Sequence, residues 1–297
     1  MVSALNQSLV EASYGKWAQP EADLTQMRTG YDQMCPPPKA EVEAVRCEIG
    51  GVSGLYIVPR DPKPGIILYL HGGGYVMGSS SSHFSMAAEL TAAAQRALFL
   101  VDYRLAPEAP FPAALDDSCS VYRALLAQGS APQQIALVGD SAGGGLALST
   151  VLTLRDLGLA APACVGTISA WADLSCSAES LVRNAGIDPI LTADVPLQYA
   201  ELYLGDHPPT DPKASALFGD FGGFPPLFMQ VGSDEILLDD SLRVAARARQ
   251  AGCDVEIEIA DGMMHVFQML TWLIPEARSA LLRMAAFVAQ KLDEATI

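Results

Sequence analysis

The stretch that decides the fold is residues 135–145, which read IALVGDSAGGG. It places the pattern G-x-S-x-G, from Gly139 to Gly143, between a short apolar run and a helix-like segment. In this context the pattern predicts a sharp bend that lifts the hydroxyl of Ser141 clear of a sheet. The glycines remove side chains that would collide across the bend, and the following helix directs free amides and a positive dipole end at the hydroxyl. We therefore expect Ser141 to be a nucleophile, with a merely tight turn as the alternative.

Short apolar runs alternate with helix-like segments on both sides of this bend. Strands are expected at residues 42–49, 52–58, 66–70, 97–101, 135–138, 163–168, 227–231 and 255–259, and helices at 84–95, 113–127, 144–157, 239–251 and 275–292. The first two strands are expected to pair antiparallel through a turn at Gly50-Gly51. Runs that are apolar at every position are typical of parallel strands covered on both faces. The alternation predicts a doubly wound, mostly parallel α/β sheet.

Two segments do not fit the alternation. Residues 1–42 are helical in character up to a run of three prolines, and residues 175–222 are too long for an ordinary connection between two strands. Both are expected over the carboxyl edge of the sheet, where open α/β folds bind ligands. We therefore expect an N-terminal cap segment (1–42), a core in two parts (43–174 and 223–297) and a cap insertion (175–222). Simple surface packing is the alternative for the two cap pieces.

Composition and charge limit the classes of partner. Half of the 297 residues are apolar, 18% are charged, and the formal net charge is −16. Such a charge repels nucleic acids and anionic lipid surfaces and favours neutral small-molecule substrates. No apolar run reaches the ~18 residues that span a bilayer, and the first residues lack the pattern of a secretory signal. Six scattered cysteines without metal-ligand spacing favour reduced thiols, so we expect a cytoplasmic protein with no metal, membrane or nucleic-acid partner.

A glycine-rich stretch, HGGG at residues 71–74, follows another expected strand. Acyl transfer passes through a tetrahedral oxyanion that needs preorganised donors, each worth roughly 3–4 kcal/mol. Three glycines allow backbone amides to approach that oxygen without obstruction by side chains. Alone, HGGG would be compatible with an ordinary turn, but beside a nucleophilic serine it predicts an oxyanion hole.

The serine needs a base, and the chain has four histidines. In this kind of sheet the order along the chain is serine, acid, histidine, which leaves His207 and His265. His207 lies in a proline-rich segment of the cap insertion and is expected to be a solvated turn residue. His265 follows the last expected strand, and we predict that it is the general base.

The acid should follow a strand and precede the histidine. Asp234 lies close behind the strand expected at 227–231 and is favoured to orient His265. Glu235 is the near alternative, because sequence does not fix the register within a loop. Asp239 and Asp240 are expected to cap the next helix.

These motifs together resemble those of the hormone-sensitive-lipase-like family of bacterial carboxylesterases. The similar segments are HGGG at 71–74, DYRLAPE at 102–108, PFPAALDD at 110–117, GDSAGG at 139–144, the D-x-x-L segment from Asp234, and the late His265. The similarity runs from about residue 45 to the C-terminus and is weaker in the N-terminal cap. One departure is Glu235, since the family commonly has proline after the aspartate.

The resemblance implies an α/β-hydrolase fold and the hydrolysis of short- to medium-chain carboxylic esters through an acyl-enzyme, without a cofactor and often as a homodimer. It also implies that the amides of Gly73, Gly74 and Ala142 form the oxyanion hole. A lactone hydrolase, or an amidase or acyltransferase with the same triad, remains an alternative. A non-catalytic ligand receptor on this fold is disfavoured, because the receptors similar to this family have lost the histidine that His265 supplies here.

Further residues are expected around the substrate or in support of the site. Candidates for substrate binding are His83, Trp171, Tyr199 and Tyr203. Residues that could line an acyl pocket or simply pack are Trp17, Met27, Tyr31, Met34 and Leu202. Arg104 and Glu108 are expected to form a buried network that supports the HGGG loop, and Asp140 is expected to be structural.

Overall fold

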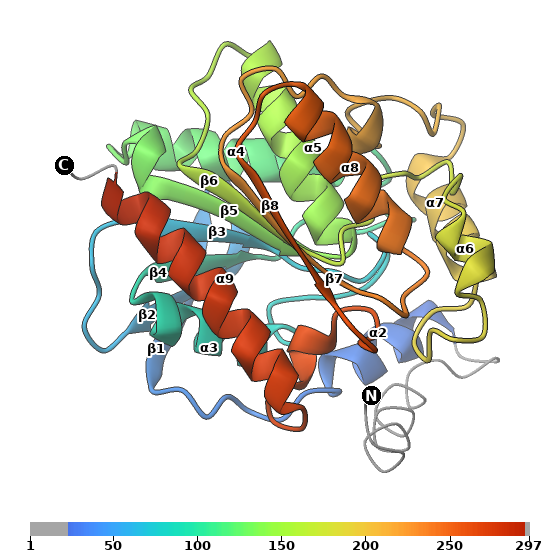
Figure 1. Ribbon diagram of the computed structural model, residues 1–297. Helices are drawn as coiled ribbons and strands as arrows, with labels where there is room; N and C mark the ends of the chain where they lie inside the picture. Colours follow the sequence, from blue (N-terminus) through green and yellow to red (C-terminus); the bar gives the residue numbers. More distant parts are fainter. Residues whose placement is uncertain (1–22, 295–297) are drawn as a thin grey trace.

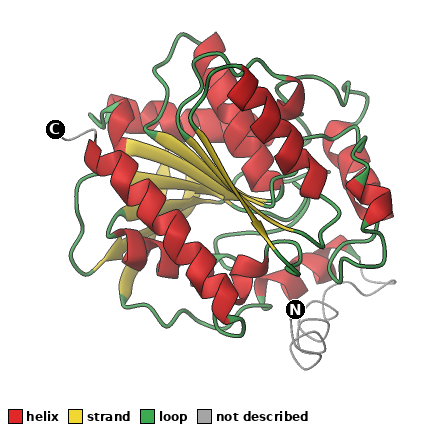
Figure 2. Cartoon of the chain, viewed as in Figure 1, coloured by secondary structure: helices red, strands yellow, loops and turns green. Residues whose placement is uncertain are grey.

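The computed structural model describes residues 23–294 and is organised around one eight-stranded sheet (Figures 1 and 2). The strands are β1 (Val42–Ile49), β2 (Val52–Pro59), β3 (Ile66–Leu70), β4 (Ala97–Val101), β5 (Ile135–Asp140), β6 (Cys164–Ile168), β7 (Leu227–Gly232) and β8 (Val255–Ala260). Their order in the sheet is β1-β2-β4-β3-β5-β6-β7-β8. Strand β2 is antiparallel to both neighbours and the other pairs are parallel, as expected for a mostly parallel doubly wound sheet.

Helices cover both faces of this sheet. Figure 1 shows α4 (Ala113–Ala127), α5 (Ala142–Asp156) and α8 (Leu238–Gln250) on one face and α3 (Phe84–Ala94) and α9 (Pro275–Glu294) on the other. Short 3₁₀ turns lie at Pro132–Gln134, Ala216–Phe218 and Phe267–Leu270. Every residue of β3 to β7 is buried, which is the physical reason why these strands are apolar at nearly every position.

The expected strands and helices are confirmed, with differences of at most two residues at their ends. Strand β8 differs in character from the other parallel strands. It lies at the edge of the sheet, its glutamates Glu256 and Glu258 alternate with apolar residues, and none of its residues is fully buried. An edge strand has one exposed side, so alternation replaces the uniform apolar pattern.

Three helices outside the layers lie near the carboxyl edge of the sheet (Figure 1). They are α2 (Leu24–Asp32), from the expected N-terminal cap segment, and α6 (Ser180–Arg183) and α7 (Asp194–Leu204), from the expected insertion. The division of the chain into cap and core segments remains a prediction, and Trp17 lies outside the described residues. Among residues 23–294 no helix is long and apolar enough to cross a membrane.

The bend between β5 and α5 is packed too closely for side chains. A Cβ on Gly139 would collide with the carbonyl of Gly143, and a Cβ on Gly143 would collide with the carbonyls of Leu70 and His71. The start of α5 therefore rests directly on the backbone that follows β3. This contact brings the expected serine and the HGGG loop together.

We expect Gly143→Ala to lower the free energy of unfolding by about 1–3 kcal/mol, because the added methyl group meets rigid backbone and not a flexible side chain. Gly222→Ala is the control, since its Cβ would lie 3.3 Å from the movable carboxylate of Asp220 and should change stability by no more than about 0.5 kcal/mol. Urea unfolding of both variants measures the difference. Equal stabilities would contradict the packing argument.

Candidate active site

Ser141 occupies a strained backbone conformation at the end of β5. Its φ of 52° and ψ of −121° are unfavourable for a residue with a side chain. Its N–H donates to the carbonyl of Ile168 at 2.8 Å, and its carbonyl accepts from Trp171 at 2.9 Å and Gly145 at 3.1 Å. These bonds from β6 and α5 hold the bend, as the G-x-S-x-G pattern predicts.

The hydroxyl of Ser141 lies 2.9 Å from Nε2 of His265, which comes from the loop after β8. Nδ1 of the same ring lies 2.7 Å from Oε2 of Glu235, in the loop after β7. All three residues are buried. The three side chains form a continuous hydrogen-bonded line, which is the geometry of a nucleophile, its base and an orienting acid.

The prediction that Asp234 orients His265 was wrong: the next residue, Glu235, lies against the histidine in the structure. The N–H of Asp234 donates to the carbonyl of Met263 at 3.1 Å, and its carboxylate accepts from the hydroxyl of Ser233 at 2.7 Å. The Glu235 carboxylate instead points inward, where Oε1 accepts from the hydroxyl of Ser169 at 2.8 Å and the N–H of Gly232 at 2.6 Å. Glu235 thus has both oxygens satisfied and one of them aimed at the histidine.

The HGGG loop lies against the serine. A Cβ on Gly72 would lie 2.2 Å from Oδ2 of the buried Asp140 and 3.1 Å from Cβ of Ser141, so a side chain there would collide. Gly73 and Gly74 have φ of 113° and 62° and line the same pocket as the serine. Ala142 is the first residue of α5, where amides have no partner within the helix. Among the described residues, the amides of Gly73, Gly74 and Ala142 donate no hydrogen bond, so all three remain free to donate to a ligand.

Asp140 braces this loop from beneath, as expected of a structural residue. It is fully buried, and its Oδ1 accepts from the hydroxyl of Tyr69 at 2.8 Å and from the amide of Gly72 at 3.1 Å. Its Oδ2 lies 3.2 Å from Nε2 of His83. Burial works against the ionised carboxylate, but the charge and hydrogen bond of His83 and the bond from Tyr69 lower the pKa of Asp140.

The prediction that His83 contacts the substrate is corrected by this arrangement. The side chain is fully buried, and its other nitrogen lies 2.8 Å from the hydroxyl of Ser82. Both ring nitrogens are therefore used inside the protein. The residue belongs to the support of the glycine loop and does not line the pocket.

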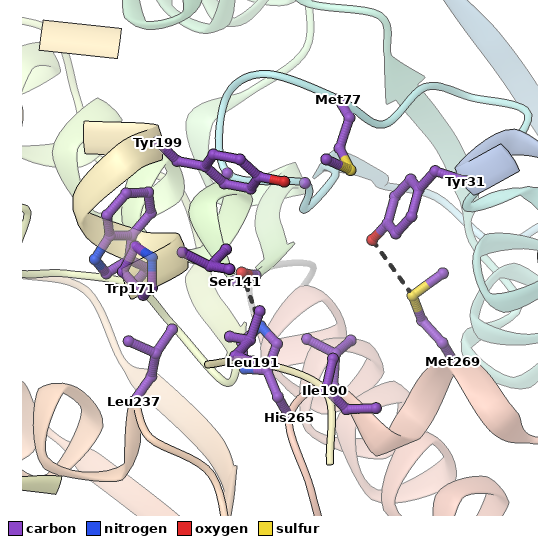
Figure 3. Close-up of a pocket in the computed structure, with 15 residues that line it drawn as sticks. Tyr31, Met77, Ser141, Trp171, Ile190, Leu191, Tyr199, Leu237, His265 and Met269 are labelled. Carbon is purple, nitrogen blue, oxygen red and sulfur yellow. Dashed lines mark hydrogen bonds between the residues drawn. The ribbon is translucent and has the colours of Figure 1, made fainter. Parts of the chain in front are cut away.

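A pocket of about 560 Å³ of empty space, counting the part open to solvent, lies in front of Ser141. Its walls are mostly apolar and come from α2, the HGGG loop, the segment after β6, the cap insertion and the loop after β8: Tyr31, Gly73, Gly74, Met77, Ser141, Trp171, Ile190, Leu191, Val195, Pro196, Tyr199, Leu237, His265, Val266 and Met269. In Figure 3, Trp171 and Leu237 lie on one side of the serine, and Tyr31, Met77 and Met269 lie on the other. The hydroxyl of Tyr31 bonds to the sulfur of Met269 at 3.9 Å and joins α2 to the last part of the chain.

Two of the four residues proposed from sequence for substrate binding line this pocket. They are Trp171 and Tyr199, and the ring of Tyr199 lies so close to Gly74 that a Cβ there would collide with it. Tyr203 does not reach the pocket, because it is buried with its ring stacked on Tyr75 at a centroid distance of 3.8 Å. Of the other candidates, Tyr31 lines the pocket, whereas Met27, Met34 and Leu202 do not.

The expected buried network of Arg104 and Glu108 is not formed. Their side chains are 57% and 63% exposed, and each has a separate partner. Arg104 pairs with Asp117, and Glu108 pairs with Arg28 of α2. Arg28 also donates to the carbonyl of Val76 at 2.8 Å, so α2 supports the end of the glycine loop from outside.

The residues that sequence reasoning missed are chiefly the apolar ones. Ile190, Leu191, Met77 and Met269 line the pocket, yet nothing in their sequence context separates them from ordinary core residues. Glu235 was not missed, because its position after a strand had already made it the alternative to Asp234. Within residues 23–294 no group of three or more His, Cys, Asp or Glu side chains is arranged to hold a metal ion.

The environment of His265 favours its charged form. Burial lowers the pKa of the imidazole, but the hydrogen bond and charge of Glu235, with further negative charge from Asp188 and Asp140, outweigh burial and raise it above its ordinary value of 6.5. An imidazolium formed when the serine gives up its proton is therefore stabilised where it forms.

Comparison with known proteins agrees with this geometry. A family model described as the alpha/beta hydrolase fold matches residues 67–269. The chain belongs to this family. The fold class expected from the sequence is thereby confirmed.

Close relatives define the class more narrowly. An acetyl-hydrolase from Streptomyces hygroscopicus is 40% identical over 247 residues, 83% of this chain and 82% of the relative. An esterase from Acinetobacter venetianus is 37% identical over 290 residues, 97% of this chain and 95% of the relative. The crystal structure of an esterase from the bacterial hormone-sensitive lipase family matches with a TM-score of 0.95 at 37% identity, covering 98% of this chain and 100% of that one. The protein is a carboxylesterase of the hormone-sensitive-lipase-like type.

The two neighbouring carboxylates provide a matched pair of variants. We expect Glu235→Gln to lower kcat by about 10³- to 10⁴-fold, because the histidine loses its orienting charge. Asp234→Asn should leave kcat nearly unchanged, since that carboxylate bonds only to a neighbouring serine. Steady-state hydrolysis of p-nitrophenyl butyrate measures both, and a larger loss in Asp234→Asn would reverse the assignment.

Proposed function

We propose that the protein hydrolyses carboxylic esters through an acyl-enzyme formed on Ser141, with His265 as general base and Glu235 as the orienting acid. The observation that carries this proposal is the hydrogen-bonded line from the serine hydroxyl through both imidazole nitrogens to a buried carboxylate. The three free amides of Gly73, Gly74 and Ala142 beside the serine support it, because they can receive the oxyanion.

The reaction follows from these positions. Ser141 attacks the ester carbonyl while His265 takes the hydroxyl proton, and the carbonyl oxygen becomes an oxyanion bound by the amides of the glycine loop and of Ala142. His265 then gives the proton to the departing alkoxide. Water enters, loses a proton to His265 and attacks the acyl-enzyme, and Ser141 leaves with the proton returned by the histidine.

The pocket supports substrates of short to medium length. The serine divides it, so the acyl part and the alcohol part of an ester would extend to opposite sides (Figure 3). Trp171 and Leu237 limit one side, and the bonded pair of Tyr31 and Met269 limits the other. These walls are mostly apolar and would favour uncharged chains, since no Lys or Arg among residues 23–294 lines the pocket.

Two further interpretations of the sequence remain predictions. The first is a cytoplasmic location, in line with six cysteines that are all free thiols. The second is a homodimer, which the resemblance implies and which gel filtration at two concentrations would test.

A series of p-nitrophenyl esters from acetate to laurate tests the proposed function. We expect kcat/KM to be highest for chains of short to medium length and to fall for laurate, which would extend beyond the walls of the pocket. Ser141→Ala should lose activity on every ester by about 10⁶-fold while keeping its fold, because the nucleophile is gone. Full activity of this variant, or a preference for laurate, would overturn the corresponding part of the proposal.

The pH dependence of kcat/KM tests the role of the histidine. The base must be neutral to accept a proton, and the pKa of His265 is raised above 6.5, so activity should fall as the pH drops through a midpoint above 6.5. Glu235→Gln removes the charge that raises this pKa, so the remaining activity should have its acid limb at lower pH. If the acid limb does not move in Glu235→Gln, Glu235 does not raise the pKa of the group that titrates.

A further inference from the structure

The first part of the cap insertion is bound to the loop that carries Glu235 by several hydrogen bonds. Asn184 donates from Nδ2 to the carbonyls of Ser233 at 3.0 Å and Glu235 at 2.8 Å. The hydroxyl of Ser180 donates to the carbonyl of Ile236 at 2.6 Å. The backbone on both sides of the acid is therefore held by cap side chains and not by the sheet alone.

Asp188 provides the central contact of this attachment. It is buried, and its Oδ2 accepts from the N–H of Ile236, the residue directly after the acid, at 3.0 Å. Its Oδ1 accepts from the N–H of Ile190 at 2.9 Å and Leu191 at 3.3 Å. One carboxylate thus joins the backbone that follows Glu235 to the backbone of Ile190 and Leu191.

The two segments that Asp188 joins, residues 190–191 and residue 236, lie in different parts of the site. Ile190 and Leu191 form part of the pocket wall, whereas residue 236 directly follows Glu235, whose Oε2 lies 2.7 Å from Nδ1 of His265. No Lys or Arg pairs with Asp188 in the described structure, so all of its hydrogen bonds come from backbone amides. A residue used only for surface solubility would not be buried in this way.

Asp188 also acts through space on the histidine. The charged groups that face His265 are Glu235, Asp188 and Asp140, and each favours the imidazolium. Burial raises the pKa of Asp188 itself, and its backbone bonds and the nearby histidine oppose that change. The same carboxylate can therefore influence both the position and the charge of the catalytic groups.

We propose that Asp188 is a positioning residue that holds the loop of Glu235 and the pocket wall at Ile190 and Leu191 in one fixed arrangement. Asp188 touches neither the serine nor the histidine by a hydrogen bond. It controls turnover through the acid. This inference rests on the proposed esterase mechanism and adds a determinant of kcat that belongs to the cap.

The test compares Asp188→Asn with Asp194→Asn. Asparagine keeps the size of the side chain at 188 but replaces an acceptor with an NH₂ group that faces a backbone N–H. Asp194 is a matched control, since it lies in the same cap insertion and accepts only local bonds from Thr192 and Gln198. We expect Asp188→Asn to lower kcat for p-nitrophenyl butyrate by about 10- to 100-fold through misplacement of the acid, and Asp194→Asn to leave it unchanged.

Two readouts separate positioning from a general structural effect. In the background of Glu235→Gln, the loss of kcat caused by Asp188→Asn should largely disappear, because the acid through which it acts has been removed. The acid limb of kcat/KM in Asp188→Asn should move to lower pH, since one of the negative charges facing His265 is lost. A loss that is the same in both backgrounds, with an unmoved acid limb, would contradict the proposal.

Failure of this inference can be distinguished from failure of the proposed function. If the unaltered protein hydrolyses no ester, the proposed esterase mechanism is wrong. If it is active and Asp188→Asn behaves like Asp194→Asn, only the role of Asp188 falls. If Asp188→Asn does not fold, Asn184→Ala replaces it in the test, because this variant removes two hydrogen bonds from the cap insertion to the acid loop. We then expect kcat to fall in the presence of Glu235 but not in the Glu235→Gln background. An unchanged kcat would contradict the proposal.

Discussion

The whole site depends on the strained backbone of Ser141. A residue with a side chain at this φ and ψ costs of order 1–3 kcal/mol and persists only when its surroundings enforce it. Here the enforcement comes from hydrogen bonds to the ends of β6 and α5 and from glycines that let backbone meet backbone. The consequence is a hydroxyl that stands away from the sheet, where an imidazole from a distant part of the chain can reach it.

Much of the fold was predictable because the physical signals are local. Buried parallel strands must be apolar along their length, and the segments between them carry helical patterns, so the alternation from residue 42 onward determined the order of elements. The serine, the histidine and the glycine loop were predictable for a similar reason. Each lies beyond the carboxyl end of a strand at the same edge of the sheet: Ser141 and the glycine loop follow their strands directly, and His265 lies in the loop after β8.

The acid was harder, because Asp234 and Glu235 are adjacent and both are carboxylates. They differ in their tertiary contacts: the Glu235 carboxylate accepts from Ser169 and Gly232 and reaches His265, whereas the Asp234 carboxylate bonds to the neighbouring Ser233. The predictions that His83 and Tyr203 bind the substrate were wrong for a different reason. A polar or aromatic side chain near a site either faces the ligand or supports the wall behind it, and only the tertiary contacts with Asp140 and Tyr75 decide between the two.

The site also joins pieces of chain that are made at very different times. Tyr31 and Met269 meet across 238 residues, and Ser141 and His265 across 124. During synthesis the serine bend can therefore form while its base has not yet been added to the chain. A nascent chain that has folded as far as β6 has the serine hydroxyl but not its base, so hydrolysis requires synthesis to have passed His265.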